Sequence, residues 1–444
     1  MRNQVSGSGP TLLSAIEKMP VVDSHEHLMP VDERSRRAKD FSYLFSQYLG
    51  PELVSAGMHP EDLKRFYSPE VSETEKIKLF LPHWRLVSHT SLAAVKQEAA
   101  RRFFGVERFD EEGLRRLSQA IRESAQPDWY RKVLDGRGIR AMVVNYMKPH
   151  HDLGWRRVED SPLYRYTANF DDFIWIASRG DIEDLESEFS LPLRTLDDLL
   201  EALEAAFAAR IEERTAALKS VMAYFRTLEV ADDPSPAEAG EIFQRLRQRS
   251  PRPFDPGLRG QDVQWARPLQ DLLMHRICRL ASRLELPLQV HVGYQAGNAN
   301  ILSHSDPRLL TPLLLRYPDL DFELLHAGYP YHLSSVALAK MFPNAYLNFS
   351  WIFALAPAAA REALSHAVEM VPAAKITAFG GDARLVESLA VHLDWARQAI
   401  AEVLDRKMAE GRLSRESALQ FARRILFTSP RKLYRLEDLG EETA

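Results

Sequence analysis

The stretch "VVDSHEHLMP" at residues 21–30 places two histidines, His25 and His27, on either side of a glutamate, directly after a short apolar run. If that run is a β-strand, residues i and i+2 point to the same side, because side chains alternate between the two faces. The two imidazoles would then leave the carboxyl end of the strand together, about 7 Å apart along the backbone. Two neutral imidazoles at that spacing can bind one metal ion, and a chance His-x-His pair on the surface is the alternative.

The composition is that of a globular protein, with 444 residues, 45% of them hydrophobic and 27% charged. This length suits one barrel-sized domain with insertions, or two domains. The net charge of −5 gives no reason to expect nucleic acid or an anionic membrane as a partner. The single cysteine, Cys278, excludes an internal disulfide and a multi-cysteine zinc site. Without a membrane-length apolar stretch or an apolar signal core in residues 1–20, we expect a cytoplasmic, soluble protein.

Eight β-like runs follow one another along the chain and largely alternate with helical sequence. They are "MPVVDSHEH", "GIRAMVVNYM", "DDFIWIAS", "ALKSVMAYF", "LPLQVHVGY", "LDFELLHAGY", "AYLNFSW" and "KITAFGGDA". This alternation predicts an α/β protein with a parallel sheet, and eight units predict a closed (β/α)8 TIM barrel. An open doubly wound sheet is the alternative, but no glycine-rich phosphate fingerprint follows the first run.

The domain organisation follows from the same pattern. We expect an N-terminal segment at 1–19, a barrel domain at 20–436 and a tail at 437–444. Apolar residues at three- and four-residue spacing predict a long helical insertion after the first strand, at about 33–135. A Pro- and Arg-rich stretch at 231–262 reads as an inserted loop with one short helix.

Ionisable residues end five of the eight runs, where the chemistry of such a barrel is found. They are His25 and His27 in the first run, Lys219 in the fourth, His291 in the fifth, His326 in the sixth and Asp382 in the eighth. The other runs end in polar residues, namely Asn145, Tyr146, Ser178, Asn348 and Ser350. Singly, each has an ordinary explanation, such as a hydrogen-bonded histidine, an aspartate in a turn or a solvated lysine. Together, the imidazoles and the carboxylate predict a site for Zn²⁺, with Mn²⁺ and Fe²⁺ as alternatives.

These residues resemble the pattern of the amidohydrolase superfamily. The matching pieces are "VVDSHEHL", "LPLQVHVGY", "FELLHAGYPY" and "KITAFGGDA". More narrowly, "LLTPLLLRYPDLDFELLHAGYPY" and "NAYLNFSW" are similar to the amidohydrolase-related branch that includes nodulin-type domains fused to glutamine synthetase. The insertion near "FSYLFSQYLGPELVSAGM" also resembles that of uronate isomerases. The resemblance covers about residues 20–436.

The resemblance implies a role for each strand-end residue. His25, His27 and Asp382 would bind a divalent ion, joined by His291 if the site is mononuclear, and Asp382 would also take a proton from the nucleophilic water. His326 would bind a second ion or orient the substrate. Lys219 would either bridge two ions as a carboxylated lysine or hold a substrate carboxylate. We favour the mononuclear site and leave a second ion open.

These roles predict a metal-dependent hydrolase that acts on an amide, lactone or ester of a small carboxylated molecule, with homo-oligomerisation left open. A bound Zn²⁺ lowers the pKa of its water from 15.7 to about 7, and a nearby carboxylate can act as general base. Arg226 would clamp the substrate carboxylate, or else form a surface ion pair, and Tyr294 would line the pocket, or else only pack. The alternatives are a decarboxylase or uronate-type isomerase on the same site, and a non-catalytic barrel.

Overall fold

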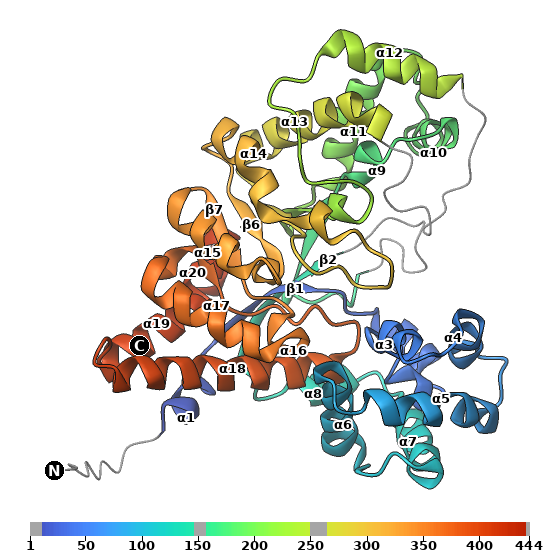
Figure 1. Cartoon of the computed structure of the whole chain (residues 1–444), viewed down its shortest axis with the longest axis vertical. Helices are drawn as coiled ribbons and strands as arrows, with labels where there is room; N and C mark the ends of the chain where they lie inside the picture. Colours follow the sequence, from blue (N-terminus) through green and yellow to red (C-terminus); the bar gives the residue numbers. More distant parts are fainter. Residues whose placement is uncertain (1–10, 146–156, 249–263, 441–444) are drawn as a thin grey trace.

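The computed structural model describes residues 11–145, 157–248 and 264–440, and within them it contains a barrel of eight parallel strands in the order β1 to β8 (Figure 1). The strands are β1 (Val21–Glu26), β2 (Ile139–Asn145), β3 (Tyr164–Asn169), β4 (Thr215–Ser220), β5 (Leu288–Val290), β6 (Phe322–Leu324), β7 (Ala345–Asn348) and β8 (Ile376–Thr377). Backbone hydrogen bonds join β1 to the segment after β8, since Ser24 N–H donates to the Phe379 carbonyl at 2.9 Å and Asp382 N–H to the His25 carbonyl at 2.8 Å. The predicted (β/α)8 barrel is therefore confirmed.

The third strand is not the predicted one. The prediction placed it at "DDFIWIAS", whereas β3 is Tyr164–Asn169, which pairs with β2 and β4. Asp171–Ile174 instead forms the short helix α9, and Ser178 caps the next helix, α10 (Arg179–Phe189). A short apolar run fits a buried strand and a buried helix equally well by periodicity. Tertiary packing decides here, because Phe173 and Ile174 are buried in a cluster with the helices on this side of the barrel.

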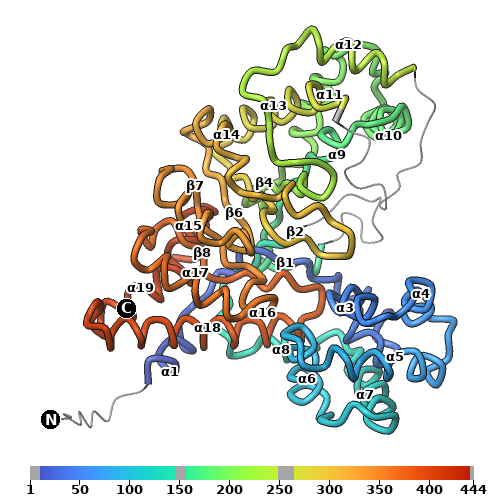
Figure 2. The backbone as a smooth tube through the Cα atoms, viewed as in Figure 1, coloured from blue at the N-terminus to red at the C-terminus, as the bar shows by residue number. Residues whose placement is uncertain are grey.

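The helical insertion after β1 is confirmed. Its helices are α2 (Val31–Arg37), α3 (Leu49–Ser55), α4 (Pro60–Tyr67), α5 (Glu73–Val87), α6 (Ser91–Phe104), α7 (Glu111–Glu123) and α8 (Trp129–Leu134). Side-chain caps begin the longer ones, since Ser72, Thr90 and Asp110 accept hydrogen bonds from the first turns of α5, α6 and α7. The insertion has its own aromatic core, which includes the stacked rings of Phe66 and Phe80. It forms a lobe beside the barrel (Figure 2).

The remaining helices connect and cover the strands. They are α11 (Leu196–Arg210), α12 (Pro236–Arg247), α13 (Arg267–Leu284), α14 (Thr311–Arg316), α15 (His332–Met341), α16 (Ile352–Leu355), α17 (Pro357–Met370), α18 (Val386–Ala409), α19 (Arg415–Arg423) and α20 (Ser429–Leu433). The helix expected in the Pro- and Arg-rich stretch is α12, and residues 249–263 lie outside the described part of the chain. Among the helices described, none combines the length and the hydropathy that a membrane crossing requires.

Two helices tie the periphery to the barrel. The N-terminal α1 (Leu12–Ile16) buries Leu12 and Ile16 in the same cluster as α17, α18 and α19. The guanidinium of Arg34 in the insertion forms a buried ion pair of 2.6 Å with Glu387 at the start of α18. Because a single buried charge would be costly, this pair makes the position of the insertion on α18 specific.

Candidate metal centre

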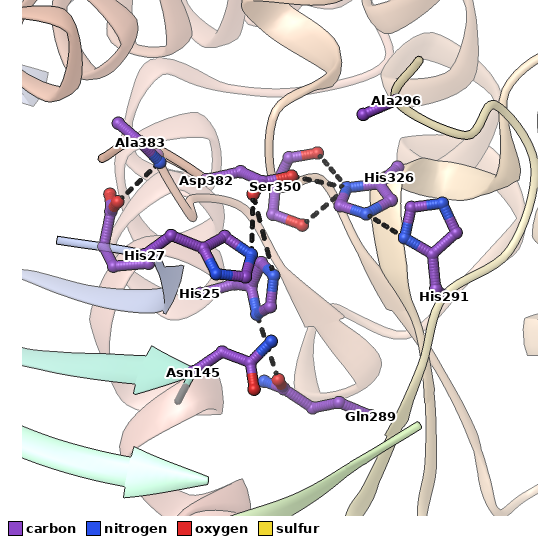
Figure 3. Close-up of polar contacts among 12 residues, drawn as sticks. His25, His27, Asn145, Gln289, His291, Ala296, His326, Ser350, Asp382 and Ala383 are labelled. Carbon is purple, nitrogen blue, oxygen red and sulfur yellow. Dashed lines mark hydrogen bonds and ion pairs between the residues drawn. The ribbon is translucent and has the colours of Figure 1, made fainter. Parts of the chain in front are cut away.

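Three side chains from the two ends of the chain form a potential metal-binding cluster at the barrel mouth. Nε2 of His27 lies 3.2 Å from Oδ1 of Asp382, and Nε2 of His25 lies 3.8 Å from the same oxygen. One ligand atom from each residue falls within 4.8 Å of the others. His25 and Asp382 are almost fully buried, whereas the His27 side chain is 24% exposed. Figure 3 shows the three side chains converging from β1 and from the loop after β8.

Gln289 on β5 fixes which nitrogen of His25 carries the proton. Its amide nitrogen donates to the Ser24 carbonyl at 2.8 Å, so its carbonyl oxygen is the atom that faces Nδ1 of His25, at 3.2 Å. A carbonyl oxygen only accepts, so Nδ1 of His25 must be the protonated nitrogen. Burial, and then the charge of Lys219, hold the pKa of His25 well below its usual value, so the ring is neutral. Nε2 of His25 therefore presents a lone pair to the carboxylate, an arrangement that a cation between them would stabilise.

His326 and His291 form a second pair of unprotonated nitrogens. Nδ1 of His326 donates to the Ser350 carbonyl at 3.1 Å, and Nε2 of His291 donates to the Tyr294 carbonyl at 2.9 Å. Burial lowers the pKa of His326 to about 4 and that of His291 well below its usual value, so both rings are neutral. Their remaining nitrogens, Nε2 of His326 and Nδ1 of His291, face each other at 3.1 Å. Two lone pairs at this distance repel each other unless a cation or a proton is shared between them.

Lys219 is buried at the carboxyl end of β4. Among the described residues its Nζ has no hydrogen-bond partner. Burial lowers the pKa of Lys219 to about 8, and Asp382, Asp171 and Glu323 only partly oppose that shift. An amine with this pKa is substantially neutral near pH 8, which makes it more nucleophilic than an ordinary lysine.

The carboxylate of Asp382 is held from several sides. Tyr48 of the insertion donates its hydroxyl to Oδ1 at 2.7 Å, and Nδ1 of His326 lies 3.7 Å from Oδ2. Burial alone would raise the pKa of Asp382, but the hydrogen bond from His27 and the surrounding imidazoles hold it well below its usual value. Burial and the same carboxylate raise the pKa of Tyr48 well above 10. At neutral pH the pair is therefore an ionised carboxylate with a protonated phenol.

The loop that carries Asp382 is pressed against β1. A Cβ at Gly381 would overlap Oε1 of Glu26, and a Cβ at Gly380 would meet Cβ of Ser350 at 2.6 Å. Ala383 N–H also donates to Oε2 of Glu26 at 2.7 Å. The two glycines of "GGDA" therefore permit a close approach that places Asp382 beside His25.

Several residues of the site have a backbone conformation that non-glycine residues rarely adopt. The φ angles are 67° at Tyr48, 59° at His326, 62° at Trp351 and 50° at Asp382. Such conformations cost about 1–3 kcal/mol each and persist only where the surroundings enforce them. Their concentration around one cluster is typical of a functional site.

The two predicted substrate-binding residues differ in position. Tyr294 lines a cleft of about 380 Å³ together with Tyr48 and Trp351, close to the cluster. Arg226 does not reach it, because its guanidinium is buried against Asp271 at 2.7 Å and the Glu229 carbonyl at 2.6 Å. The alternative explanation of Arg226 was an ion pair at the surface, and the observed ion pair with Asp271 is buried. Of the other predicted strand-end residues, Asn145 accepts a hydrogen bond from Thr167, and Tyr146 lies outside the described residues.

The donor set suits a divalent cation. Imidazole nitrogens and a carboxylate are ligands that Zn²⁺ takes in proteins. A single ion would be held by His25, His27 and Asp382, and His291 is not brought within the same group but faces His326. The site residues that the sequence did not predict are Tyr48 and Gln289, whereas Trp351 belongs to the aromatic cluster after strands 5 to 7 that the sequence predicted to line the pocket. The sequence contained a signal that could have identified Gln289. It lies two residues before His291, so its side chain points to the same face of the sheet.

Comparisons with known proteins agree with this fold. The chain is 28% identical over 266 residues to protein fluG of Emericella nidulans, which covers 56% of this chain but only 29% of that protein. Its fold is similar to a uronate isomerase of Thermotoga maritima (TM-score 0.75, 14% identity, 95% and 96% of the two chains). It is also similar to a glucuronate isomerase of Caulobacter crescentus (TM-score 0.71, 19% identity, 98% and 97%) and to a proposed metal-dependent hydrolase of Lactobacillus casei (TM-score 0.68, 16% identity, 97% and 99%).

The sequence profile of the Amidohydrolase family matches residues 201–436, more than half of the chain. That match includes four of the six strand-end residues, namely Lys219, His291, His326 and Asp382. The barrel brings the other two, His25 and His27, to the same mouth. The chain thus belongs to the amidohydrolase family.

Proposed function

We propose that the protein is a metal-dependent hydrolase that cleaves an amide, lactone or ester bond of a small carboxylated substrate. The observation that carries this proposal is the ionised Asp382 carboxylate beside the unprotonated Nε2 of His25. A divalent ion at this site, with Zn²⁺ as the preferred ion, would supply Lewis acidity and an activated water. Asp382 would accept the proton of the attacking water and return it to the leaving group.

The surrounding residues would hold and shield this base. Tyr48 and His27 orient the carboxylate by their contacts with Oδ1. The Trp351 ring stacks on Tyr48 at 4.4 Å and lies 5.4 Å from His326, so the two aromatic rings limit the access of bulk water. Lys219, buried without a hydrogen-bond partner among the described residues, would receive the substrate carboxylate next to the reacting bond.

Two ions are the second possibility for the site. It is supported by the lone pairs of His291 and His326 that face each other, because a second cation between them would remove their repulsion. In that arrangement Lys219 would be carboxylated and would bridge the ions, rather than bind substrate. The number of ions per chain, together with a mass increase on Lys219, separates the two arrangements.

A uronate-type isomerase or a decarboxylase is the second candidate function. It is favoured by the direct contact between a protonated phenol and an ionised carboxylate at Tyr48 and Asp382. An acid and a base at this distance can move a proton between neighbouring substrate atoms without hydrolysis.

The test is metal analysis of the purified protein, followed by assays on panels of amides, lactones, esters, uronates and aromatic acids. We expect either about one or about two ions per chain. A chelator should abolish hydrolysis and Zn²⁺ should restore it. Asp382→Asn should lower kcat by at least about 100-fold. Asp319→Asn, which alters an exposed carboxylate, is the matched control. Absence of stoichiometric metal overturns the proposal. Ketose formation or release of CO₂ without hydrolysis replaces it by the second candidate, and an intact, metal-loaded protein without any turnover replaces it by a non-catalytic barrel.

A further inference from the structure

A cleft lies between the insertion and the barrel, and its lining residues Tyr48 and Trp351 contact residues of the metal centre. Its volume is about 380 Å³, and its walls come from α3, α5 and α6 on one side and from the loops after β5 and β7 on the other. At its inner end Tyr48 donates to Asp382, and Trp351 lies against His326. A substrate with its reacting group at the metal centre would therefore place the rest of its structure in this cleft.

The charge of the cleft is set by one residue. Glu52 is the sole carboxylate among its described lining residues, and none of these is a lysine, arginine or histidine. The Thr90 hydroxyl donates to Oε2 of Glu52 at 2.6 Å, which fixes the side chain in place. Oε1 of Glu52 has no hydrogen bond to any residue that the structure describes. Burial raises the pKa of Glu52, while the Thr90 bond and the charges of His89 and Lys96 oppose that shift.

The positive charge near Glu52 does not belong to the cleft wall. Nζ of Lys96 is buried and donates to the Ser388 hydroxyl at 2.9 Å. Burial lowers the pKa of Lys96 to about 8, with Glu387 and Glu52 opposing the shift. A ligand in the cleft would thus meet the Glu52 carboxylate rather than a cation.

Aromatic and apolar side chains make up most of the rest of the wall, beside the polar Ser55, Thr90 and Asn298. The Tyr294 and Trp351 rings lie 5.8 Å apart, and Tyr48 stacks on Trp351 at 4.4 Å. Leu86 lines the cleft with 59% of its surface exposed, so it presents an apolar side chain to a ligand bound there. Aromatic faces attract cations as well as apolar groups, and they bind ammonium groups in particular.

We propose that the cleft binds the distal part of the substrate as an aromatic or aliphatic body that ends in an ammonium or guanidinium group, paired with Glu52. This inference rests on the proposed function, whose reacting end it extends. It refines the expectation of a carboxylated substrate, because a substrate carboxylate would find a cation at Lys219 of the metal centre and none among the described residues that line the cleft. The substrate class is then a small molecule with its anionic group beside the scissile bond and a cationic group at the far end.

The experiment measures binding of three probes of similar size to the purified, metal-containing protein by calorimetry. The probes are 2-phenylethylamine, 2-phenylethanol and 2-phenylethanesulfonate. We expect the amine to bind about tenfold more tightly than the alcohol, and the sulfonate to bind most weakly. Glu52→Gln keeps the shape and the acceptor for Thr90 but removes the charge, so the amine should then bind within about twofold of the alcohol.

Two further variants make the result specific. Glu70→Gln removes an exposed charge from the insertion outside the cleft and should leave all three affinities unchanged. Leu86→Lys adds a cation at an exposed position of the cleft wall and should weaken amine binding while it strengthens sulfonate binding. Equal affinities for amine and alcohol in the wild type, tight sulfonate binding, or a preference for amine that survives Glu52→Gln would each overturn the inference.

The binding readout separates this inference from the proposed function. A protein that prefers the amine through Glu52 but hydrolyses nothing would overturn the hydrolase alone. A protein that hydrolyses its substrates but shows no amine preference would overturn the cleft assignment alone.

Discussion

Tyr48 and Asp382, which are 334 positions apart in the chain, are joined by a hydrogen bond of 2.7 Å from the phenol to Oδ1 of the carboxylate. The bond links the helical insertion to the loop after β8, and so it connects the lobe that forms the cleft to the residue proposed as the base. A donor to an ionised carboxylate stabilises the charged form. The insertion thus contributes to the chemistry of the site as well as to its walls.

Removing this donor should shift the pH profile. In Tyr48→Phe the ring stack on Trp351 remains but the ionised form of Asp382 loses a hydrogen bond, so the pKa of Asp382 rises. The acid limb of the kcat/KM profile should therefore move to higher pH, and the plateau should fall about 10- to 100-fold. Tyr67→Phe removes a phenol that donates to the Phe45 carbonyl within the insertion, and it should leave the profile in place. An unshifted acid limb in Tyr48→Phe would contradict the prediction.

Metal affinity should depend on Gln289. Gln289→Leu removes the acceptor of the Nδ1 proton of His25, so the ring is no longer held in the tautomer that exposes Nε2. We expect the dissociation constant of Zn²⁺, measured by competition with a chelator, to rise about 10- to 100-fold. Gln295→Leu alters another buried glutamine, whose amide donates to the Ala223 carbonyl, and it should change the constant by less than about twofold. Equal affinities of the two variants would argue against the tautomer assignment.

The buried amine of Lys219 should make the metal-free protein less stable. Burial lowers its pKa from 10.5 to about 8, so the folded state binds this proton less tightly than the unfolded chain. The resulting penalty is complete below about pH 8 and disappears as the pH rises toward 10.5. Lys219→Met should accordingly raise the free energy of unfolding of the metal-free protein at pH 7, by up to about 3 kcal/mol, and abolish activity. Urea denaturation measures the first effect, with exposed Lys64→Met as the control. A lower stability of Lys219→Met at pH 7 would count against an unpaired ammonium.

The close approach at Gly381 should be essential for the metal centre. In Gly381→Ala the new Cβ overlaps Oε1 of Glu26, so the loop and Asp382 must move away from β1. We expect a loss of metal affinity of at least about tenfold, measured by the same chelator competition. Gly240→Ala is the matched change, since a Cβ there meets no atom within 4 Å, and in α12 it should stabilise the protein by about 0.5–1 kcal/mol. Full metal affinity in Gly381→Ala would show that the loop tolerates the displacement.

The sequence by itself determined the barrel and the positions of its strand-end residues. Parallel strands that alternate with helices close into one barrel, and the carboxyl ends of all of them meet at one mouth. Residues as distant as His25 and Asp382 could therefore be assigned to one place without coordinates, because the topology brings them there. The misplaced third strand marks the limit of this reasoning, since the apolar residues Phe173 and Ile174 fit a helix as well as a strand until their neighbours are known.

Only the tertiary structure decided which partner each polar group has. Arg226 was a candidate substrate clamp until Asp271, on a helix that follows much later in the chain, proved to hold its guanidinium. Tyr48 carried no local signal, because an aromatic residue in a helical insertion is usually part of a core. The tautomer of His25 depends on Gln289, and the facing nitrogens of His291 and His326 depend on two backbone carbonyls. Hydrogen bonds are short-ranged and directional, so the fold alone does not fix them, and they decide whether the imidazoles offer lone pairs or protons to the site.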